Sequence, residues 1–431
     1  MTSGLKCVKL FLTNLHELIA FNTQMAGSSI LRSDDPRRSD DLRTENRRRV
    51  LGCLRASGPC SPAKVANDTG LSPASISSLT KQLVEQGIAI RNRQKADNGS
   101  RGRPQSLIEL NATAGDIVTL NLAIDLIQVQ RINYAGALLH DELLATDTRS
   151  LDKRQFVDIV CQQIKQVINL NIGHPVQQIG IAFQGLVDNP GGNLSWSPII
   201  RHTDVDLGDV LQNIFKLPVS VKNDCQLISQ ALSISASETL GQSFATVAFF
   251  HGVGLGLYID GKPFTGVSTS ALELGHLRFE RDGALCRCGR KGCIEAYAAD
   301  YGIQRLANGT SIHEPPVGRV GSDEMQTLSH AGIANDQPAV QAFAIAGAAI
   351  GEGLLTLFTL LDPMPVALVG RSIEGLDLMR KGINSVFREQ KHTAVCIDDL
   401  LHCFEEAEPL LLMGLASNTL AHVDAQFSYP K

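Results

Sequence analysis

The sequence lacks a long apolar run, a positive net charge and an evenly spaced set of cysteines. No run of about 18 uncharged apolar residues occurs, so we expect no transmembrane helix and no membrane insertion. The net charge of −5 argues against nucleic-acid binding, which normally requires a basic surface. Of the ten cysteines, seven are scattered and three lie within eight residues. This spacing excludes a secreted disulfide framework and indicates a metal-binding protein of the reducing cytoplasm.

The net charge hides a strong asymmetry along the chain. Residues 43–110 contain twelve Lys and Arg against five Asp and Glu, a balance of +7, so the remaining residues carry −12. A basic segment joined to an acidic body indicates a nucleic-acid partner for the basic part.

The length of 431 residues predicts roughly two to four domains. We expect residues 1–42 to be an N-terminal extension that is disordered or wrongly assigned, and in the second case translation starts at Met25 and residues 1–24 are not translated. The segment is polar and charged near its end, and it lacks the continuous apolar core of a signal peptide.

Residues 43–87 have the pattern of a helix-turn-helix. Residues 43–55 predict one helix, and two further helices are predicted after Ser61-Pro62 and Ser72-Pro73, each a capping residue followed by proline at the first helical position. Gly70 and Gly87 are predicted to end these two helices. In the last helix the apolar stripe is expected at Ile76, Leu79 and Leu83.

The other face of this last helix is expected to meet DNA. Small polar groups at the start of a recognition helix can approach base edges and phosphates, although a solvated helix face has the same composition. Residues 88–110 predict a β-hairpin wing with an Arg-Gly-Arg-Pro segment, whose arginines suit a narrow minor groove. The candidate DNA contacts are Ser72, Ala74, Ser75, Ser77, Ser78, Lys81, Arg101 and Arg103.

Beyond Asn111 the pattern changes to alternating strands and helices. Residues 117–134 predict a hairpin, residues 155–170 an amphipathic helix, and residues 341–361 a long helix rich in Ala and Gly. Mixed strands and crossover helices over residues 111–431 indicate an α/β body that is too large for one core and divides into two lobes.

Residues 273–297 contain the most specific motif. His276, Cys286, Cys288 and Cys293 provide three thiolates and one imidazole, a ligand set that suits tetrahedral Zn²⁺. Because all four positions would be filled by protein, we expect a structural zinc site over residues 276–293. The alternative is a group of free buried cysteines beside a core histidine.

These motifs resemble the ROK family of repressors, open reading frames and sugar kinases. The resemblance rests on Glu-x-Gly-His at Glu273–His276, on the Cys-x-Cys-Gly-x-x-Gly-Cys-x-Glu stretch at 286–295, and on the winged helix, which points to the repressor branch. It implies a winged helix-turn-helix at 43–110 followed by a two-lobed, actin-like, sugar-kinase-like body at 111–431 that binds sugar and forms oligomers.

The resemblance also implies a sugar site. Family members hold sugar hydroxyls with residues that match Asn223, Asp224, Glu273, His276 and Glu295. Carboxylates that accept paired hydrogen bonds from neighbouring hydroxyls supply this specificity. His276 is expected to bind zinc through one ring nitrogen and to offer the other to the sugar. The alternative for Asn223 and Asp224 alone is a turn at the end of a strand.

The kinase chemistry of the family is expected to be lost here. Family kinases use the residue that matches Asp224 as catalytic base, and this residue is present. Their phosphate loop Asp-x-Gly-Gly-Thr, however, becomes Asn121-Leu122-Ala123-Ile124-Asp125, which loses both glycines and places a carboxylate near the phosphates. The later Gly-Gly-Gly loop becomes Gly370-Arg371-Ser372.

We therefore predict a cytoplasmic, sugar-responsive transcriptional regulator, most simply a repressor of carbohydrate-uptake or catabolic genes. Its expected partners are operator DNA, a sugar or sugar phosphate, and further copies of itself in a dimer or tetramer, with a transporter subunit as a further candidate. An ATP-dependent sugar kinase that uses Asp224 as its base is the alternative.

Overall fold

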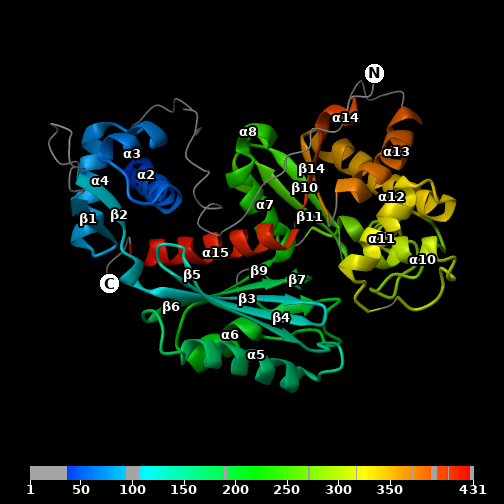
Figure 1. The fold of residues 1–431 in the computed structure, drawn as a ribbon, viewed down its shortest axis with the longest axis horizontal. Helices are drawn as coiled ribbons and strands as arrows, with labels where there is room; N and C mark the ends of the chain where they lie inside the picture. The colour runs from blue at the N-terminus through cyan, green and yellow to red at the C-terminus, as the bar shows by residue number, and fades with distance from the viewer. Residues whose placement is uncertain are drawn as a thin grey trace.

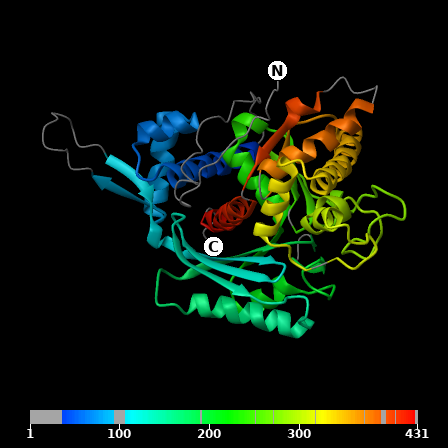
Figure 2. The same ribbon diagram turned by 45° about the vertical axis from the view of Figure 1, so that its right-hand side comes forward.

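The computed structural model describes residues 36–93, 106–188, 192–249, 251–269, 272–316, 318–370, 373–389, 396–405 and 407–427. Figures 1 and 2 show a small N-terminal head beside a larger two-lobed body. The predicted DNA contacts Arg101 and Arg103, together with Arg371 and Ser372, lie outside the described residues.

The head contains three helices and a two-stranded antiparallel sheet, as expected for a winged helix-turn-helix. Its elements are α2 (Pro36–Ser57), α3 (Pro62–Thr69), α4 (Pro73–Glu85), β1 (Ala89–Arg93) and β2 (Ser106–Leu110). The side chains of Ser61 and Ser72 cap α3 and α4 by accepting hydrogen bonds from Lys64 N and Ser75 N, and a left-handed Gly70 ends α3. The predicted capping signals are confirmed.

Two details of the head differ from the prediction. Helix α2 begins at Pro36 rather than near residue 43, because proline is tolerated in a first helical turn and the polar residues that follow can remain helical. In α4 the buried face consists of Ile76, Thr80 and Leu83, whereas Leu79 is only half-buried. Thr80 can be buried because its hydroxyl donates to the carbonyl oxygen of Ile76 at 2.7 Å.

The first lobe is built on a five-stranded mixed sheet with the order β5-β4-β3-β6-β9. Its strands are β3 (Asp116–Ala123), β4 (Leu126–Asn133), β5 (Leu138–Ala145), β6 (Val176–Phe183) and β9 (Val219–Asn223). Helices α5 (Lys153–Ile168) and α6 (Leu207–Phe215) bury apolar side chains against one face of this sheet. The predicted hairpin at 117–134 and helix at 155–170 are present.

The second lobe repeats this topology with the order β12-β11-β10-β13-β14. In both sheets an antiparallel three-stranded meander is followed by two parallel strands. The strands are β10 (Phe244–Phe249), β11 (Val253–Ile259), β12 (Lys262–Pro263), β13 (Val366–Val369) and β14 (Leu401–Phe404). This repetition accounts for the two lobes that the length predicted.

Helices of the second lobe cover one face of its sheet. They are α9 (Glu295–Ala298), α10 (Asp300–Ala307), α11 (Ser322–Ile333), α12 (Gln337–Leu361), α13 (Ile373–Glu389) and α14 (Ile397–Leu400). Residues of β10 alternate between two cores, since Ala245 and Val247 face these helices whereas Phe244 and Ala248 face the opposite side.

Two helices lie between the sheets. α7 (Asp224–Ser235) and α15 (Ala407–Gln426) pack against each other, against β3 and β6 of the first sheet, and against the inner face of the second sheet. In Figure 1 α15 runs across the centre of the molecule from the second lobe towards the head. The same helix therefore contacts both lobes and the head.

Helix α12 bears on the expectation that no segment spans a membrane. Among the described residues it is long and apolar enough to cross a membrane by length and composition, although Glu352 interrupts its apolar run. Half of its most apolar stretch is buried inside the protein, where Ala346, Ile350 and Leu354 belong to the core of the second lobe. Burial against neighbouring helices explains the apolar composition.

The remaining short elements connect these parts. They are η1 (Ala112–Ala114), β7 (Leu186–Val187), β8 (Leu194–Trp196), α8 (Ser237–Leu240) and η2 (Leu274–His276).

Candidate functional site

A cleft of about 470 Å³, continuous with solvent, lies where strands of the two sheets end. Gln184 follows β6, Asn223 ends β9, Glu273 precedes η2, and Glu295 begins α9. The carboxyl ends of parallel strands are a common location for ligand sites in α/β folds. All five residues predicted to hold a sugar line this one cleft: Asn223, Asp224, Glu273, His276 and Glu295.

Asn223 and Asp224 join β9 to α7. The side-chain oxygen of Asn223 caps α7 by accepting from Cys225 N at 2.9 Å, while its amide donates to the Gly185 carbonyl oxygen at 3.0 Å. Asp224 also accepts from Cys225 N, at 2.8 Å. Asn223 therefore forms the turn at the end of a strand that was the predicted alternative to sugar binding. This turn fixes Asp224 at the edge of the cleft.

Asp224 is 7% exposed, and its burial raises the pKa of its carboxyl group to about 6. The charge of nearby Glu273 acts in the same direction. Burial likewise raises the pKa of Glu273. Two carboxyl groups with raised pKa values in one cleft are typical of a binding or catalytic site.

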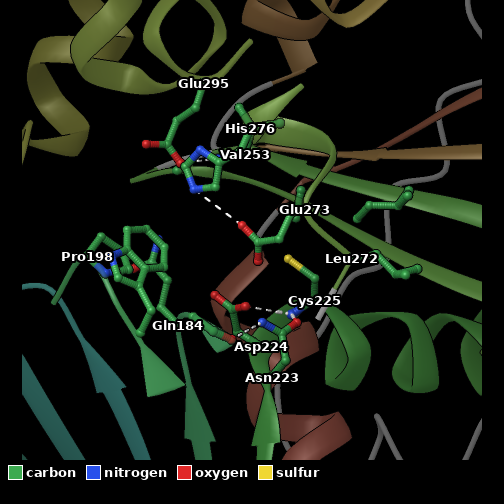
Figure 3. A pocket seen from close by; sticks show the side chains of 16 residues that line it. Gln184, Pro198, Asn223, Asp224, Cys225, Val253, Leu272, Glu273, His276 and Glu295 are labelled. Atoms are coloured by element: carbon green, nitrogen blue, oxygen red, sulfur yellow. Dashed lines mark hydrogen bonds and ion pairs between the residues drawn. The ribbon is translucent and has the colours of Figure 1, made fainter. Parts of the chain in front are cut away.

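His276 lies between the cleft and a cluster of thiols. Its Nε2 lies 3.3 Å from Oε2 of Glu273, as Figure 3 shows, whereas its Nδ1 lies 3.7 Å from Sγ of Cys286. The ring of Trp196 packs edge-on against the imidazole, with the ring centroids 5.3 Å apart. One nitrogen thus faces the thiols and the other faces a carboxylate of the cleft.

Glu295 connects the cleft to the same cluster. It is 4% exposed, and its Oε1 accepts from the Tyr301 hydroxyl at 3.2 Å and from the Cys286 thiol at 3.4 Å. Its Oε2 lies near Val253 N on the β10–β11 hairpin, at 3.4 Å. The carboxylate of Glu295, one of the predicted sugar contacts, is therefore held rigidly by its neighbours.

The ligand atoms of His276, Cys286, Cys288 and Cys293 all lie within 4.8 Å of one another. Sγ of Cys288 is 3.7 Å from Sγ of Cys293, a separation that leaves both as free thiols. Gly292 has a φ of +75°, and a Cβ there would overlap the carbonyl oxygen of Glu280. This turn brings the cysteines together, and the cluster could hold a metal ion.

The segment that matches the family phosphate loop forms the β3–β4 turn. Ile124 is buried, and Asp125 is in the left-handed region with a φ of +58°. Burial and the neighbouring Asp147 raise the pKa of Asp125, and its carboxylate lies close to Gly318 in the second lobe. The turn therefore has Ala123 and Ile124 where a phosphate loop has its two glycines, and a carboxylate where it has threonine.

On α4, five of the predicted DNA contacts are exposed: Ser72, Ala74, Ser77, Ser78 and Lys81. Ser75 is half-buried, and its hydroxyl pairs with that of Ser72 at 2.9 Å. Lys81 lies 3.8 Å from Glu85 in an exposed ion pair, which is worth little and leaves the ammonium available.

Several residues of the cleft were not predicted from the sequence, namely Gln184, Trp196, Pro198 and Cys225. Trp196 is the only tryptophan of the chain and ends the short strand β8, and its singularity was a signal that could have been used. Cys225 had none, because its place at the cleft follows from α7 packing against Gly254 of β11.

The ROK family pattern matches residues 127–405, and a winged helix-turn-helix DNA-binding pattern matches residues 43–89. The first match covers more than half of the chain. The chain belongs to the ROK family. The expected fold is thereby confirmed: a winged helix-turn-helix followed by a ROK α/β body of the sugar-kinase type.

Relatives of this ROK protein include regulators. The xylose repressor of Bacillus subtilis (strain 168) is 25% identical over 346 residues, which cover 79% of this chain and 86% of the relative. The DNA-binding transcriptional dual regulator NagC of Escherichia coli (strain K12) is 25% identical over 354 residues, which cover 77% and 82%.

Solved structures of other ROK proteins share the fold. A ROK family transcriptional regulator, a homologue of the Escherichia coli MLC protein, has a TM-score of 0.68 at 21% identity, covering 90% of this chain and 98% of that one. A ROK family glucokinase from Streptomyces griseus, solved with glucose and AMPPNP, has a TM-score of 0.55 at 23% identity and covers 70% and 98%.

Proposed function

We propose that this protein is a sugar-responsive transcriptional repressor. One observation carries the proposal: a single chain joins a winged helix-turn-helix to a cleft lined by carboxylates that suit sugar hydroxyls. Similar proteins that are named xylose repressor and N-acetylglucosamine repressor support it. Sugar bound between the lobes would favour one lobe arrangement and so change operator affinity.

In this proposal the sugar is held by Asn223, Asp224, Glu273, His276 and Glu295, with Trp196 closing one side of the cleft. The described residues that line the cleft include three carboxylates and no lysine or arginine. A phosphate dianion among these carboxylates would be repelled, whereas neutral hydroxyls donate hydrogen bonds to them. The lining therefore favours an unphosphorylated sugar over a sugar phosphate.

We assign the cluster of His276, Cys286, Cys288 and Cys293 to a structural Zn²⁺. Three thiolates and one imidazole are the preferred donors for this ion, and the convergence of all four atoms fits tetrahedral coordination. Zinc would crosslink the loop and hold the imidazole through Nδ1, which leaves Nε2 directed at Glu273 and the sugar.

Operator DNA would be contacted by residues 43–110, which we take as the DNA-binding domain. The proposed contacts on α4 are Ser72, Ala74, Ser75, Ser77, Ser78 and Lys81, with Arg101 and Arg103 supplied by the wing. Residues 111–431 would bind the sugar and form a dimer or tetramer. We infer a cytoplasmic location from the DNA partner, and we retain a transporter subunit as a candidate partner.

Sugar kinase activity is the alternative, and Asp224 is the observation in its favour. As a buried carboxyl group with a pKa of about 6 it suits the role of a base that accepts a hydroxyl proton. The β3–β4 turn argues against this activity, because Ile124 and Asp125 replace a glycine and a threonine and so provide no backbone cradle for phosphates.

The proposed function is tested by selecting DNA duplexes with the full-length chain and titrating the complex with sugars. We expect sequence-specific binding at moderate salt, and a change of at least about fivefold in DNA affinity with one of D-xylose, D-glucose or N-acetylglucosamine. Binding without sequence preference, together with no response to any sugar, would reject the function.

A further inference from the structure

The C-terminal end of α15 is joined to the head by a buried ion pair. Asp424 accepts two hydrogen bonds from Arg55 at the end of α2, from Nη1 at 3.2 Å and from Nη2 at 3.1 Å. It also accepts one from the hydroxyl of Tyr134, immediately after β4, at 2.6 Å. The side chains of Arg55 and Asp424 are only 10% and 11% exposed. Three separate parts of the chain therefore meet at one carboxylate.

Aromatic contacts restrict this cluster further. The guanidinium carbon of Arg55 lies 5.4 Å from the centre of the Tyr134 ring, and the ring of Phe427 packs edge-on against Tyr134 at 5.7 Å. Tyr134 is 1% exposed. The charged carboxylate of Asp424 is hydrogen-bonded on both oxygens and enclosed by aromatic rings, so its hydrogen bonds can form in one geometry only. The cluster therefore fixes the orientation of the head more than it contributes to the free energy of unfolding.

An apolar core surrounds the cluster and is shared between head and body. Buried head residues, including Val50 and Leu54 of α2, pack with Ile132 of β4 and with Leu420 and Val423 of α15. The head is thus not joined to the body by the connecting chain alone, and its position depends on where the end of α15 lies.

The other part of α15 is packed tightly on α7. A Cβ on Gly414 would overlap the carbonyl oxygen of Leu227, and Nδ2 of Asn418 donates to Oε1 of Gln230 at 3.0 Å. α7 begins at Asp224, which lines the sugar cleft. Such close backbone packing leaves no room for sliding, so a displacement of α7 must displace α15.

We propose that Arg55, Tyr134 and Asp424 are positioning residues through which the sugar cleft sets the orientation of the DNA-binding head, with α7 and α15 as the connecting elements. The inference rests on the proposed function. Sugar hydroxyls that bind Asp224 displace the first turn of α7, and α15 moves with α7. Because Asp424 of α15 is bonded to Arg55, the end of α2 moves as well. In Figure 1 α15 runs from the second lobe towards the blue head, along this path.

The decisive variant is Tyr134→Phe, which removes one hydrogen bond to Asp424 and keeps the ring that contacts Arg55 and Phe427. The full-length chain is titrated with its selected duplex in the absence and presence of D-xylose, D-glucose or N-acetylglucosamine. If the sugar changes the wild-type affinity about tenfold, we expect Tyr134→Phe to reduce that factor to about threefold or less. Its sugar affinity, measured calorimetrically without DNA, should stay within about twofold of wild type.

The matched control is Asp398→Asn, which breaks a hydrogen-bonded ion pair with Arg380 of 2.7 Å. Asp398 belongs to α14, which lies in the second lobe away from the head in Figure 1. In this control the sugar should change the DNA affinity by the same factor as in the wild type. The inference is overturned if Tyr134→Phe also keeps that factor, or if both variants lose it equally, because the latter result indicates a general loss of stability.

A hydrogen-exchange measurement separates this inference from the proposed function. Sugar should change amide exchange at the end of α2, around residues 50–57, in the wild-type chain but not in Tyr134→Phe. If sugar binds and produces this change while DNA affinity does not respond, the proposed function fails and the coupling stands. If sugar binds without altering exchange in the head, or alters it equally in the variant, the coupling is rejected. Absence of sugar binding rejects both.

Discussion

The cleft proposed to bind sugar and the β3–β4 turn, which matches the family phosphate loop, differ in how their polar groups are held. In the proposed sugar site Asp224 accepts from a backbone amide of α7, Glu295 accepts from a tyrosine hydroxyl, and His276 lies beside the thiol cluster. In the β3–β4 turn Ala123 and Ile124 stand where the phosphate loop has glycines, and Asp125 stands where it has threonine.

This difference shows that sugar recognition and phosphoryl transfer have separable requirements. Recognition needs fixed hydrogen-bond acceptors, whereas transfer also needs exposed backbone amides and positive charge at the phosphates. In the proposed function, this chain lacks the second set and responds to sugar through the first.

The largest effect is expected from Cys288→Ser, which tests whether the thiol cluster supports the proposed sugar site. Loss of the metal should lower the free energy of unfolding by about 4 kcal/mol or more and abolish the sugar response. Elemental analysis and thermal unfolding measure both. Cys396→Ser, at an exposed cysteine, is the control and should behave as wild type. Full metal content in Cys288→Ser would remove this residue from the ligand set.

The next effect concerns Glu273, whose carboxylate faces His276 in the cleft. Glu273→Gln replaces a charged acceptor by a neutral one and should weaken sugar binding about tenfold to a hundredfold, as expected for a hydrogen bond to a charged group. Calorimetric titration measures this change, while DNA binding without sugar should stay as in wild type. Glu238→Gln, on the exposed part of α8, is the matched control. Parallel loss of sugar and DNA binding would instead indicate a folding role.

A smaller, graded effect is expected from pH. The pKa of Asp224 is about 6 because the group is buried, so protonation below this pH removes a charged acceptor. Sugar affinity should fall by up to about tenfold per pH unit below 6, and Asp224→Asn should remove this part of the profile. In the free protein a raised pKa acts in the other direction on stability. The contribution of Asp224 is full at low pH and is lost as the pH rises through 6.

The smallest expected signal is phosphoryl transfer. A coupled ADP-release assay with the same sugars should give no turnover above background, since the β3–β4 turn offers no phosphate cradle. Turnover that disappears in Asp224→Asn would show that Asp224 and the β3–β4 turn together still support phosphoryl transfer. The triple variant Ala123→Gly, Ile124→Gly, Asp125→Thr then asks whether nucleotide binding can be restored to this turn.

Local signals predicted much of this architecture because they act over a few residues. The two Ser-Pro starts located α3 and α4, and the spacing of Cys286, Cys288 and Cys293 located the cluster. The start of α2 and the burial of Thr80 were missed, because polar residues permit a helix without specifying one.

By itself, the sequence determined the family, the basic head and acidic body, and five of the residues that converge at the cleft, because each of these depends on residue type and short-range spacing. Only the tertiary structure decided that Trp196 and Cys225 join the cleft and that Asp424 meets Arg55 across 369 residues of chain. Such contacts depend on how helices pack between two sheets, and no local sequence pattern specifies which distant residue a side chain will contact.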